Sequence, residues 1–390
     1  MRILLTSGPA YGHVNPMLPL AHEARRAGHQ VAVATGAELA PEIERRGFDT
    51  WLVGPSRAEF DASFRLAHPD PGSLSPEQRR QIQVLSGLFV ESAAKRAVEL
   101  VPRAQQWRPD LVVHEVTELA GALAAAHTGA RHVVHGLGLM PTAQAWQALF
   151  GPGFERLCRE WQVPQLSGGL RFTTYLDICP PSLSTGSEPP WRQIQPLRPA
   201  AGEPAVGERL SHAIAALPYP QTIHLTLGTI FHEAPGVLET AIAGLRQLPL
   251  NLVVTSGPGT DPARFGPQPP HVLIEPYIPH SLLLPRCRLV VSHGGAGIML
   301  GALAHGLPQL ILPQGADQFM NAVACRSAGA ALALTSEQLS AQAVAAAAER
   351  LITEPGFAGA AGRIQTEIDA MPSADTVLTA LTALTAEDEP

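Results

Sequence analysis

Short apolar runs rich in β-branched residues alternate along the chain with stretches of helical periodicity. The apolar runs predict strands at residues 2–7, 30–35, 49–53, 110–115 and 131–135 of the first half, and at 222–227, 252–256, 272–277, 289–293, 309–312 and 331–334 of the second half. Helical stretches lie between most of these strands, for example 16–27, closed by Gly28, and 118–127, closed by Gly129. Such alternation predicts parallel sheets covered by helices on both faces. We therefore expect an α/β protein built from two doubly wound domains.

A compositional change divides the two halves. Residues 180–220 are dense in Pro, Gly and Ser, without a sustained period, and this predicts a linker with surface loops. We expect an N-terminal domain over 1–205, a C-terminal domain over 206–372, and a helix with an acidic tail over 373–390 that could pack back on the first domain. A second irregular region, 55–76, is either a ligand lid or a plain insertion.

The turn after the predicted strand 289–293 is the most informative feature of the chain. The strand ends at His293, and Gly294, Gly295 and Gly297 follow before a helical pattern begins. A glycine turn between strand and helix presents backbone N–H groups and a helix N-terminus, both of which favour phosphate. The alternative is that these glycines only allow the helix to pack closely on the strand. We expect a phosphorylated ligand bound by the main chain.

A loop with the sequence SGPAYGHVNP follows the first predicted strand and contains His13. Open α/β folds bind their ligands at this carboxyl edge of the sheet, and an imidazole that titrates near neutrality suits a general base. Glu115, at the end of the predicted strand 110–115, is the preferred carboxylate partner, ahead of Glu118 and Asp110. The alternatives are a loop histidine that caps a helix and a solvated glutamate.

Four further residues carry weaker signals. Thr229 follows a strand in the sequence Leu-Gly-Thr and could donate to a phosphate, although a plain turn explains it equally well. Asp317 and Gln318, just after the strand 309–312, offer groups that suit vicinal hydroxyls. Tyr277 could stack on a flat base or could be a half-buried core residue.

Composition and charge exclude several classes of function. Lys and Arg number 27 against 34 Asp and Glu, with no basic stripe, so nucleic acid is not an expected partner. The four cysteines are scattered without C-x-x-C spacing, and the start of the chain lacks the pattern of a signal peptide, so we expect a cytoplasmic protein. No apolar stretch is long enough for stable membrane insertion. Because no D-x-D pair occurs, we expect a metal-independent site.

Taken together, these motifs resemble the bacterial, natural-product (macrolide and antibiotic) branch of the family 1 glycosyltransferases, which have the GT-B fold. The likeness runs nearly end to end and is strongest over 4–20, 109–138 and 276–329, where the chain has the elements G-H-x-N-P-x-L-P-L-A, H-G-G-A-G and D-Q-x-x-N-A. The resemblance implies two Rossmann-like domains that face each other across a cleft, with the acceptor on the first and the nucleotide sugar on the second.

The resemblance also implies a role for each candidate residue. His13 looks like the base that deprotonates the acceptor hydroxyl, and Glu115 stands where the family often has a supporting carboxylate. Tyr277 stands where a base-stacking tryptophan is usual, and Ile278 would contact the pyrimidine through its main chain. The diphosphate would meet Thr229, His293, Gly294, Gly295, Ala296 and Gly297, and the sugar hydroxyls would meet Asp317 and Gln318.

Three positions depart from the family pattern. Tyr277 replaces the usual tryptophan, and Ile298 stands where a threonine or serine hydroxyl commonly meets the phosphate. Gly301 occupies the place of the ribose-binding glutamate of the plant branch, which favours the bacterial branch and dTDP donors.

We therefore expect an inverting hexosyltransferase that moves a hexose or deoxyhexose from a dTDP- or UDP-sugar to a hydroxyl of a lipophilic natural-product aglycone, with no cofactor. The acceptor pocket is expected to include Phe60, Phe64, Trp146 and Phe150, while core packing is favoured for Leu88 and Phe89. The alternatives are a lipid or carotenoid acceptor, a C-glycosyltransferase, a nucleotide-sugar epimerase and a non-catalytic auxiliary protein with the GT-B fold. The sequence leaves a homodimer open.

Overall fold

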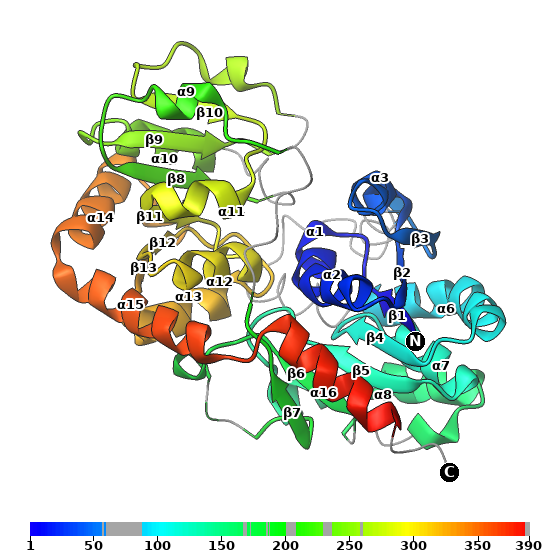
Figure 1. Ribbon diagram of the computed structural model, residues 1–390. Helices are drawn as coiled ribbons and strands as arrows, with labels where there is room; N and C mark the ends of the chain where they lie inside the picture. Colours follow the sequence, from blue (N-terminus) through cyan, green and yellow to red (C-terminus); the bar gives the residue numbers. More distant parts are fainter. Residues whose placement is uncertain are drawn as a thin grey trace. The chain divides into compact units, whose positions relative to one another are not determined.

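The computed structural model describes most of the chain as two compact units (Figure 1). The first comprises Met1–Cys179, Gly186–Arg198 and the chain from Met371 onward, and the second comprises Pro180–Thr185 and Pro199–Ala370. The described residues are 1–56, 58–59, 88–166, 170–171, 173–184, 186, 188–199, 208–228, 236–257 and 260–386. Phe60, Phe64, Thr229 and the acidic tail lie outside them.

The first unit is built on a seven-stranded parallel sheet with the order β3-β2-β1-β4-β5-β6-β7. Its strands are β1 (Arg2–Thr6), β2 (Gln30–Thr35), β3 (Asp49–Leu52), β4 (Leu111–Glu115), β5 (Arg131–His135), β6 (Thr174–Asp177) and β7 (Gln193–Pro196). Its helices are α1 (Tyr11–Val14), α2 (Leu18–Arg26), α3 (Ala40–Arg45), α6 (Leu88–Trp107), α7 (Ala120–Thr128), α8 (Ala143–Glu160) and α16 (Ala374–Ala386). Short 3-10 turns are η1 (Asn15–Met17), η2 (Ala37–Leu39) and η4 (Pro164–Leu166).

The second unit is built on a six-stranded parallel sheet with the order β10-β9-β8-β11-β12-β13. Its strands are β8 (Thr222–Thr226), β9 (Asn251–Thr255), β10 (Val272–Glu275), β11 (Cys287–Ser292), β12 (Gln309–Ile311) and β13 (Ala331–Ala333). Its helices are α9 (His212–Ala215), α10 (Val237–Leu245), α11 (His280–Leu283), α12 (Ala296–Ala304), α13 (Gln318–Ser327), α14 (Ala341–Thr353) and α15 (Pro355–Ala370), with 3-10 turns η5 (Pro181–Leu183), η6 (Pro262–Phe265) and η7 (Leu284–Arg286).

The predicted α/β class with two doubly wound sheets is confirmed. Strands such as β4, β8 and β9 are buried along their whole length, because helices cover both faces of each sheet and the strands can be apolar throughout. Within the part of the chain that the structure describes, no helix is long and apolar enough to cross a bilayer.

The sequence pattern missed two strands at one edge of the first sheet. Each is four residues long, and β7 is polar and mostly exposed, with Pro196 as its last residue. Proline is tolerated there because an edge strand has no partner on its outer side. The region 180–220, expected to be a linker with surface loops, therefore also contributes an edge strand.

Each sheet has one point at which its strand order reverses. In the first sheet this point lies between β1 and β4, and in the second it lies between β8 and β11. Loops at the carboxyl ends of the strands flanking such a point leave a crevice in which open α/β sheets bind ligands. The topology therefore directs attention to the loops that follow these four strands.

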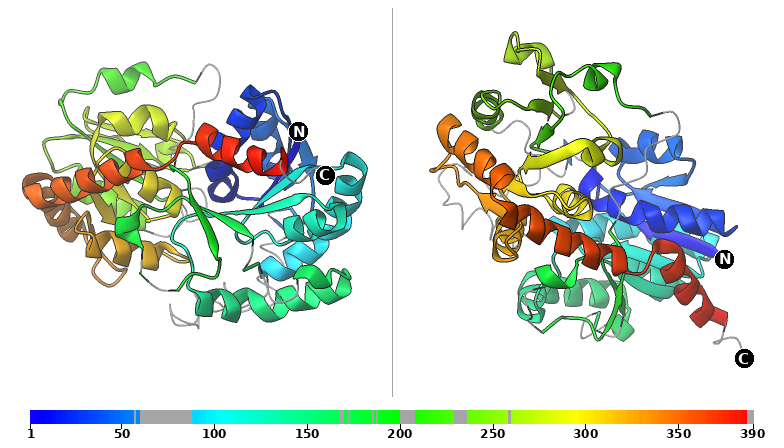
Figure 2. Two further views of the ribbon diagram at one scale, coloured as in Figure 1. Left: turned by 60° about the horizontal axis from the view of Figure 1, so that its bottom comes forward. Right: turned by 60° about the vertical axis from the view of Figure 1, so that its left-hand side comes forward.

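The last helix, α16, packs against α2 of the first unit (Figure 2). Its apolar residues Val377, Leu378 and Leu381 are buried. A hydrogen bond of 2.9 Å from the Arg131 side chain to the carbonyl oxygen of Leu381 fixes the helix further. The C-terminal helix is thus part of the first unit's structure.

One glycine of the first unit lies where two elements approach closely. A Cβ added at Gly121 in α7 would lie 2.5 Å from His114 Cβ and 2.5 Å from Thr6 Oγ1, which belong to β4 and β1. The absence of a side chain at Gly121 thus lets α7 lie directly on the two strands that flank the reversal point.

We predict that Gly121→Ala lowers the free energy of unfolding by about 1–3 kcal/mol, because the added methyl group overpacks this contact. The matched change Gly362→Ala, in α15, meets no atom within 4 Å. It should raise the unfolding free energy by about 0.5–1 kcal/mol, since alanine favours a helix. Urea denaturation of both variants tests the pair, and equal effects would contradict the close approach.

Candidate active site

His13 stands at the carboxyl edge of the first sheet, in the short helix α1 that follows β1. Its Nδ1 atom lies 2.8 Å from Oε1 of Glu115, the last residue of β4. The His13 side chain is 24% exposed, whereas the Glu115 side chain is fully buried. The histidine therefore turns one nitrogen toward a buried carboxylate while part of its ring reaches the surface.

The Glu115 carboxylate is held by several donors. Thr117 donates its backbone N–H to Oε2 at 2.6 Å and its hydroxyl to the two oxygens at 2.8 Å each, and the Gly8 N–H lies 3.3 Å from Oε1. Burial alone raises the pKa of Glu115, but the His13 ring and the hydrogen bonds from His13 and Thr117 outweigh burial and lower the pKa to about 2.

This ionisation state determines the tautomer of the histidine. An ionised carboxylate can only accept hydrogen bonds, so Nδ1 of His13 carries the proton in the 2.8 Å contact with Glu115. In a neutral ring of this tautomer the lone pair is on Nε2, at the far edge. Nε2 is therefore the atom at which a general base of this arrangement would take a proton.

A second buried layer lies beneath this pair. Glu118 accepts hydrogen bonds from the Thr6 hydroxyl and from two N–H groups at the start of α7, and it lies 3.3 Å from Arg96 Nε. Arg96 in turn donates to the carbonyl oxygen of Ser7, in the loop that leads to His13. Glu118 is thus engaged in holding the loop.

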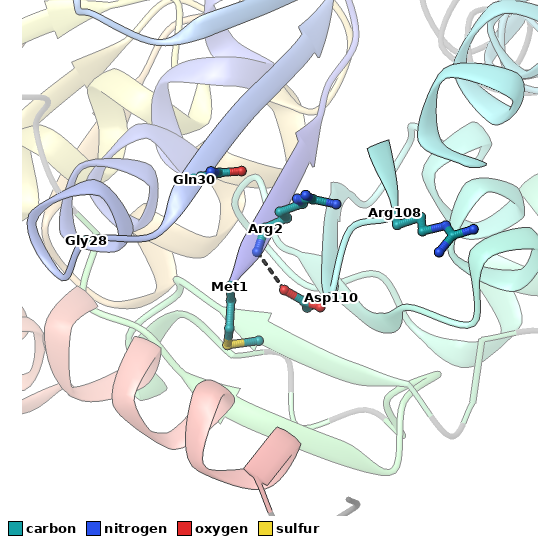
Figure 3. Close-up of a pocket in the computed structure, with 6 residues that line it drawn as sticks. All are labelled: Met1, Arg2, Gly28, Gln30, Arg108 and Asp110. Carbon is teal, nitrogen blue, oxygen red and sulfur yellow. Dashed lines mark hydrogen bonds between the residues drawn. The ribbon is translucent and has the colours of Figure 1, made fainter. Parts of the chain in front are cut away.

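Asp110, the other alternative partner, lies at the opposite edge of the sheet. Its carboxylate accepts a hydrogen bond of 2.6 Å from the Arg2 backbone, within a polar pocket of about 350 Å³ (Figure 3). The pocket is lined by Met1, Arg2, Gly28, Gln30, Arg108 and Asp110. Because it opens at the amino ends of β1 and β2, it is separate from the site around His13.

An aromatic row leads from His13 into the core of the first unit. The Phe89 ring lies 6.3 Å from the His13 ring at an interplanar angle of 29°, Phe150 lies 6.2 Å from Phe89, and Trp146 lies 4.5 Å from Phe150. Trp146 and Phe150 are each only 5% exposed and belong to the core. Phe89, for which core packing was favoured, is the half-buried member beside His13.

The glycine turn of the second unit follows β11 and leads into α12. Gly294 has φ +83°, and a Cβ there would lie 2.5 Å from Ile311 Cγ2. Gly295 is the N-cap residue of α12 and provides no side-chain hydrogen bond to the first N–H groups of the helix. The helix has nine residues, and Gly297 in its first turn is exposed. Uncapped N–H groups at a helix start are suited to an anion.

The His293 ring lies between two glycines of the second unit. A Cβ at Gly228 would lie 2.6 Å from its Cε1 atom, and a Cβ at Gly295 would lie 2.4 Å from its Nε2 atom. Burial lowers the pKa of His293 to about 4, with a smaller contribution from His280, although the Thr226 carbonyl acts in the opposite direction. His293 is therefore neutral near pH 7.

Ile298, the departure in the first turn of α12, is only 5% exposed. It packs in a small apolar cluster with Leu284, Val290, Ala302 and Leu307. The side chain at this position completes the core, so the first turn contributes main-chain donors alone.

Asp317 and Gln318 lie at the start of α13. Gln318 is buried, and its Oε1 accepts hydrogen bonds from the backbone of Gln314 at 2.7 Å and of Gly315 at 3.1 Å. Asp317 is exposed, and its Oδ2 accepts a hydrogen bond of 2.8 Å from Asn321 Nδ2. The same Nδ2 lies 2.9 Å from the carbonyl oxygen of Gly294, so the structure joins the two predicted donor-binding segments.

The remaining predicted donor residues lie after β10. Tyr277 is 60% exposed, while the Ile278 side chain is buried in an apolar cluster. Sequence reasoning missed Thr117 and Asn321. Among the described residues, no group of three His, Cys, Asp or Glu side chains is arranged to hold a metal ion.

Residues 23–190 match the family model described as "Erythromycin biosynthesis protein CIII-like, N-terminal domain", and residues 253–384 match the corresponding C-terminal domain. An L-demethylnoviosyl transferase of Streptomyces niveus is 34% identical, over 91% of this chain and 90% of that protein. The 10-deoxymethynolide desosaminyltransferase of Streptomyces venezuelae is 29% identical, over 99% of this chain and 98% of that protein.

Solved structures show the same likeness over nearly the whole chain. The glycosyltransferase VinC in complex with dTDP is 27% identical, with a TM-score of 0.77 over 99% of this chain and 100% of that one. The spinosyn rhamnosyltransferase SpnG, complexed with spinosyn aglycone, is 26% identical, with a TM-score of 0.79 over 98% of this chain and 100% of that one. The expected GT-B fold is thereby confirmed.

A buried histidine of the second unit gives a prediction for stability. His224 is fully buried in β8, its ring lies 5.2 Å from that of His280, and burial together with His280 lowers its pKa to about 3, against the effect of the Val253 carbonyl. Because the folded state binds this proton less readily than the unfolded chain does, the contribution of His224 to stability is complete above pH 6.5. It falls by about 1.4 kcal/mol per pH unit below that value, or about 2 kcal/mol at pH 5.

We therefore expect His224→Gln to reduce the pH dependence of the unfolding free energy between pH 6.5 and 5 by about one proton. Urea denaturation of the original chain and the variant over this range measures the difference. The same slope in both would show that His224 is not held neutral by the fold.

Proposed function

Because the chain belongs to the erythromycin biosynthesis protein CIII-like family of glycosyltransferases, we propose that it transfers a hexose or deoxyhexose from a dTDP- or UDP-sugar to a hydroxyl of a lipophilic natural-product aglycone, with inversion at the anomeric carbon. The observation that carries the proposal is the hydrogen bond between His13 and the buried, ionised Glu115 at the carboxyl edge of the first sheet.

In this proposal the acceptor hydroxyl binds against Nε2 of His13. As the hydroxyl oxygen forms its bond to the anomeric carbon of the donor, its proton moves to Nε2, and the ring becomes an imidazolium. The Glu115 carboxylate, 2.8 Å from Nδ1, stabilises that positive charge and keeps the ring oriented. Its low pKa means that it remains ionised throughout, so the proton stays on the histidine.

The bond between the anomeric carbon and the diphosphate oxygen breaks in the same step, and the electron pair remains on that oxygen. The uncapped N–H groups at the start of α12 would stabilise the developing charge, together with the neutral N–H donor of His293. No metal ion is needed for this charge balance, because the first turn of a helix supplies preorganised dipoles. Thr229 is proposed to add a hydroxyl, and Asp317 and Gln318 to bind the sugar.

The names of the relatives support the choice of donor and acceptor. VinC was solved with dTDP, SpnG was solved with spinosyn aglycone, and a relative from Streptomyces galilaeus is a 2-deoxy-L-fucose transferase. On the acceptor side, the half-buried Phe89 beside His13 would present an apolar surface to the aglycone. Trp146 and Phe150 would then mainly support Phe89 from behind and would contribute less through direct contact with the aglycone.

We predict that His13→Ala lowers kcat by about 10²-fold or more, the range for loss of a general base, while the affinity for dTDP remains close to normal. The assay follows dTDP release with an acceptor on which the unmodified protein is active. His29→Ala, at the amino edge of the same sheet, is the control and should retain activity. Full activity of His13→Ala would remove this residue from the mechanism.

A donor panel tests the nucleotide half of the proposal. A ligand at 100 times its dissociation constant stabilises a folded protein by about 2.7 kcal/mol, so dTDP- and UDP-sugars should raise the melting temperature measurably. Gly295→Ala should weaken this effect, because the new Cβ would lie 2.4 Å from His293 Nε2. Gly362→Ala should preserve it. If no nucleoside diphosphate stabilises the protein, the donor assignment is wrong.

A further inference from the structure

Asn321 connects two donor-binding segments of the second unit that lie far apart in the sequence. It is a residue of α13 with a fully buried side chain. Its Nδ2 group donates to the carbonyl oxygen of Gly294 at 2.9 Å and to Oδ2 of Asp317 at 2.8 Å. A single amide group is thus hydrogen-bonded both to the glycine turn and to the carboxylate at the start of α13.

The Asp317 side chain does not cap its own helix, although Asp317 occupies the N-cap position. Asp317 is the N-cap residue of α13, where an aspartate ordinarily accepts a hydrogen bond from the first turn of its own helix. Here it makes no such side-chain cap, and Oδ2 instead accepts from Asn321. The preceding residue, Ala316, has φ +52°, a left-handed conformation that non-glycine residues rarely adopt. The backbone and the side chain of Asp317 are therefore both held in a specific arrangement.

Asn321 is also an unfavourable residue for this site on stability grounds alone. Its Oδ1 is buried without a hydrogen-bond partner among the residues that the structure describes. An unsatisfied buried acceptor destabilises the folded state, and an apolar side chain of similar shape would avoid that penalty. The benefit of the amide must therefore come from its NH₂ group and the two oxygens that it joins.

We propose that Asn321 is a positioning residue that holds the Asp317 carboxylate in register with the glycine turn, so that the sugar and the diphosphate of one donor molecule are bound together in the reactive geometry. The inference rests on the proposed function, since it takes Asp317 as a sugar contact and the glycine turn as the diphosphate contact. Asn321 touches neither the sugar nor the diphosphate in this assignment, and it acts only through Asp317 and Gly294.

The proposal predicts that loss of the Asn321 amide lowers the rate of sugar transfer but leaves nucleotide binding nearly unchanged. Loss of the amide would remove the hydrogen bond that Asp317 Oδ2 accepts from Asn321 and change the position of the carboxylate. A misplacement of about 1 Å in a reacting complex can lower the rate by about 10²-fold. The glycine turn, by contrast, keeps its own constraints, because Gly294 is packed against Ile311 and its N–H lies 3.1 Å from Ser292 Oγ. Binding of the nucleotide without a sugar should then change little.

The test compares Asn321→Leu with the unmodified protein in two assays. Calorimetry with dTDP alone reports on the glycine turn, and kcat/KM for the donor sugar in the transfer assay reports on the sugar contact. We expect kcat/KM to fall by about 10²-fold with dTDP affinity nearly unchanged. Asn321→Asp preserves the shape of the side chain but places a carboxylate against Asp317, and it should show the same pattern. This variant replaces the leucine variant in both assays if the leucine variant does not fold.

Asn251→Leu is the matched control. Asn251 is a buried asparagine at the amino end of β9. Its Oδ1 accepts a hydrogen bond from the Tyr219 backbone N–H, and its Nδ2 donates to the Tyr219 carbonyl oxygen. The same substitution there should lower the melting temperature without a selective loss of transfer. In an Asp317→Ala background, Asn321→Leu should have little further effect on kcat/KM, because the residue through which it acts is already gone.

The outcomes separate the inference from the proposed function. If the unmodified protein transfers sugar and Asn321→Leu transfers it equally well, the positioning role is refuted while the proposed function stands. Equal losses of dTDP affinity and of kcat/KM would also refute it, since Asn321 would then only maintain the turn. If the unmodified protein neither binds dTDP nor transfers a sugar, the proposed function fails and the inference fails with it.

Discussion

Placing an ionised carboxylate in the interior of a protein is costly unless it is fully hydrogen-bonded, and the first unit is organised around meeting that condition for Glu115. The carboxylate has no exposed surface, and its oxygens accept from Thr117, Gly8 and His13. The loop that supplies two of these donors is itself held by Arg96, which contacts the Ser7 carbonyl and pairs with Glu118. The orientation of the His13 ring follows from this arrangement.

The second unit is expected to bind a negatively charged ligand, whereas the first unit stabilises a negative charge of its own. Three histidines of the second unit nevertheless carry no charge near pH 7, because burial lowers the pKa of His224, His280 and His293 to between about 3 and about 4. Attraction for a diphosphate would come from N–H dipoles at the start of α12 and not from a cation. In the proposed function, neutral donors would allow the diphosphate to leave after transfer, since they would bind it less tightly than a buried ion pair would.

The elements and several partners could be predicted from the sequence because they depend on periodicity and topology. Glu115 was expected beside His13 since Glu115 ends one strand and His13 follows another at the same edge of a parallel sheet, and the structure places Nδ1 of His13 2.8 Å from Oε1 of Glu115. Thr117 and Asn321 could not be identified in that way, because their contacts depend on the geometry of one turn and the phase of one helix. The strand β7 was missed because a short, polar edge strand carries no apolar signal.

The two units share one topology, although different chemical roles are proposed for them. In each, the strand order reverses between the first and fourth strands in chain order, β1 and β4 or β8 and β11. In the first unit these positions carry the His13 loop and Glu115, and in the second they carry Gly228 and the His293 turn. Gly228 and Gly295 of the second unit bring the backbone close to the His293 ring, whereas the first unit places the Glu115 carboxylate at the corresponding strand end. The proposed base and the proposed anion site thus differ by a few residues at equivalent strand ends, while the sheets that support them remain alike.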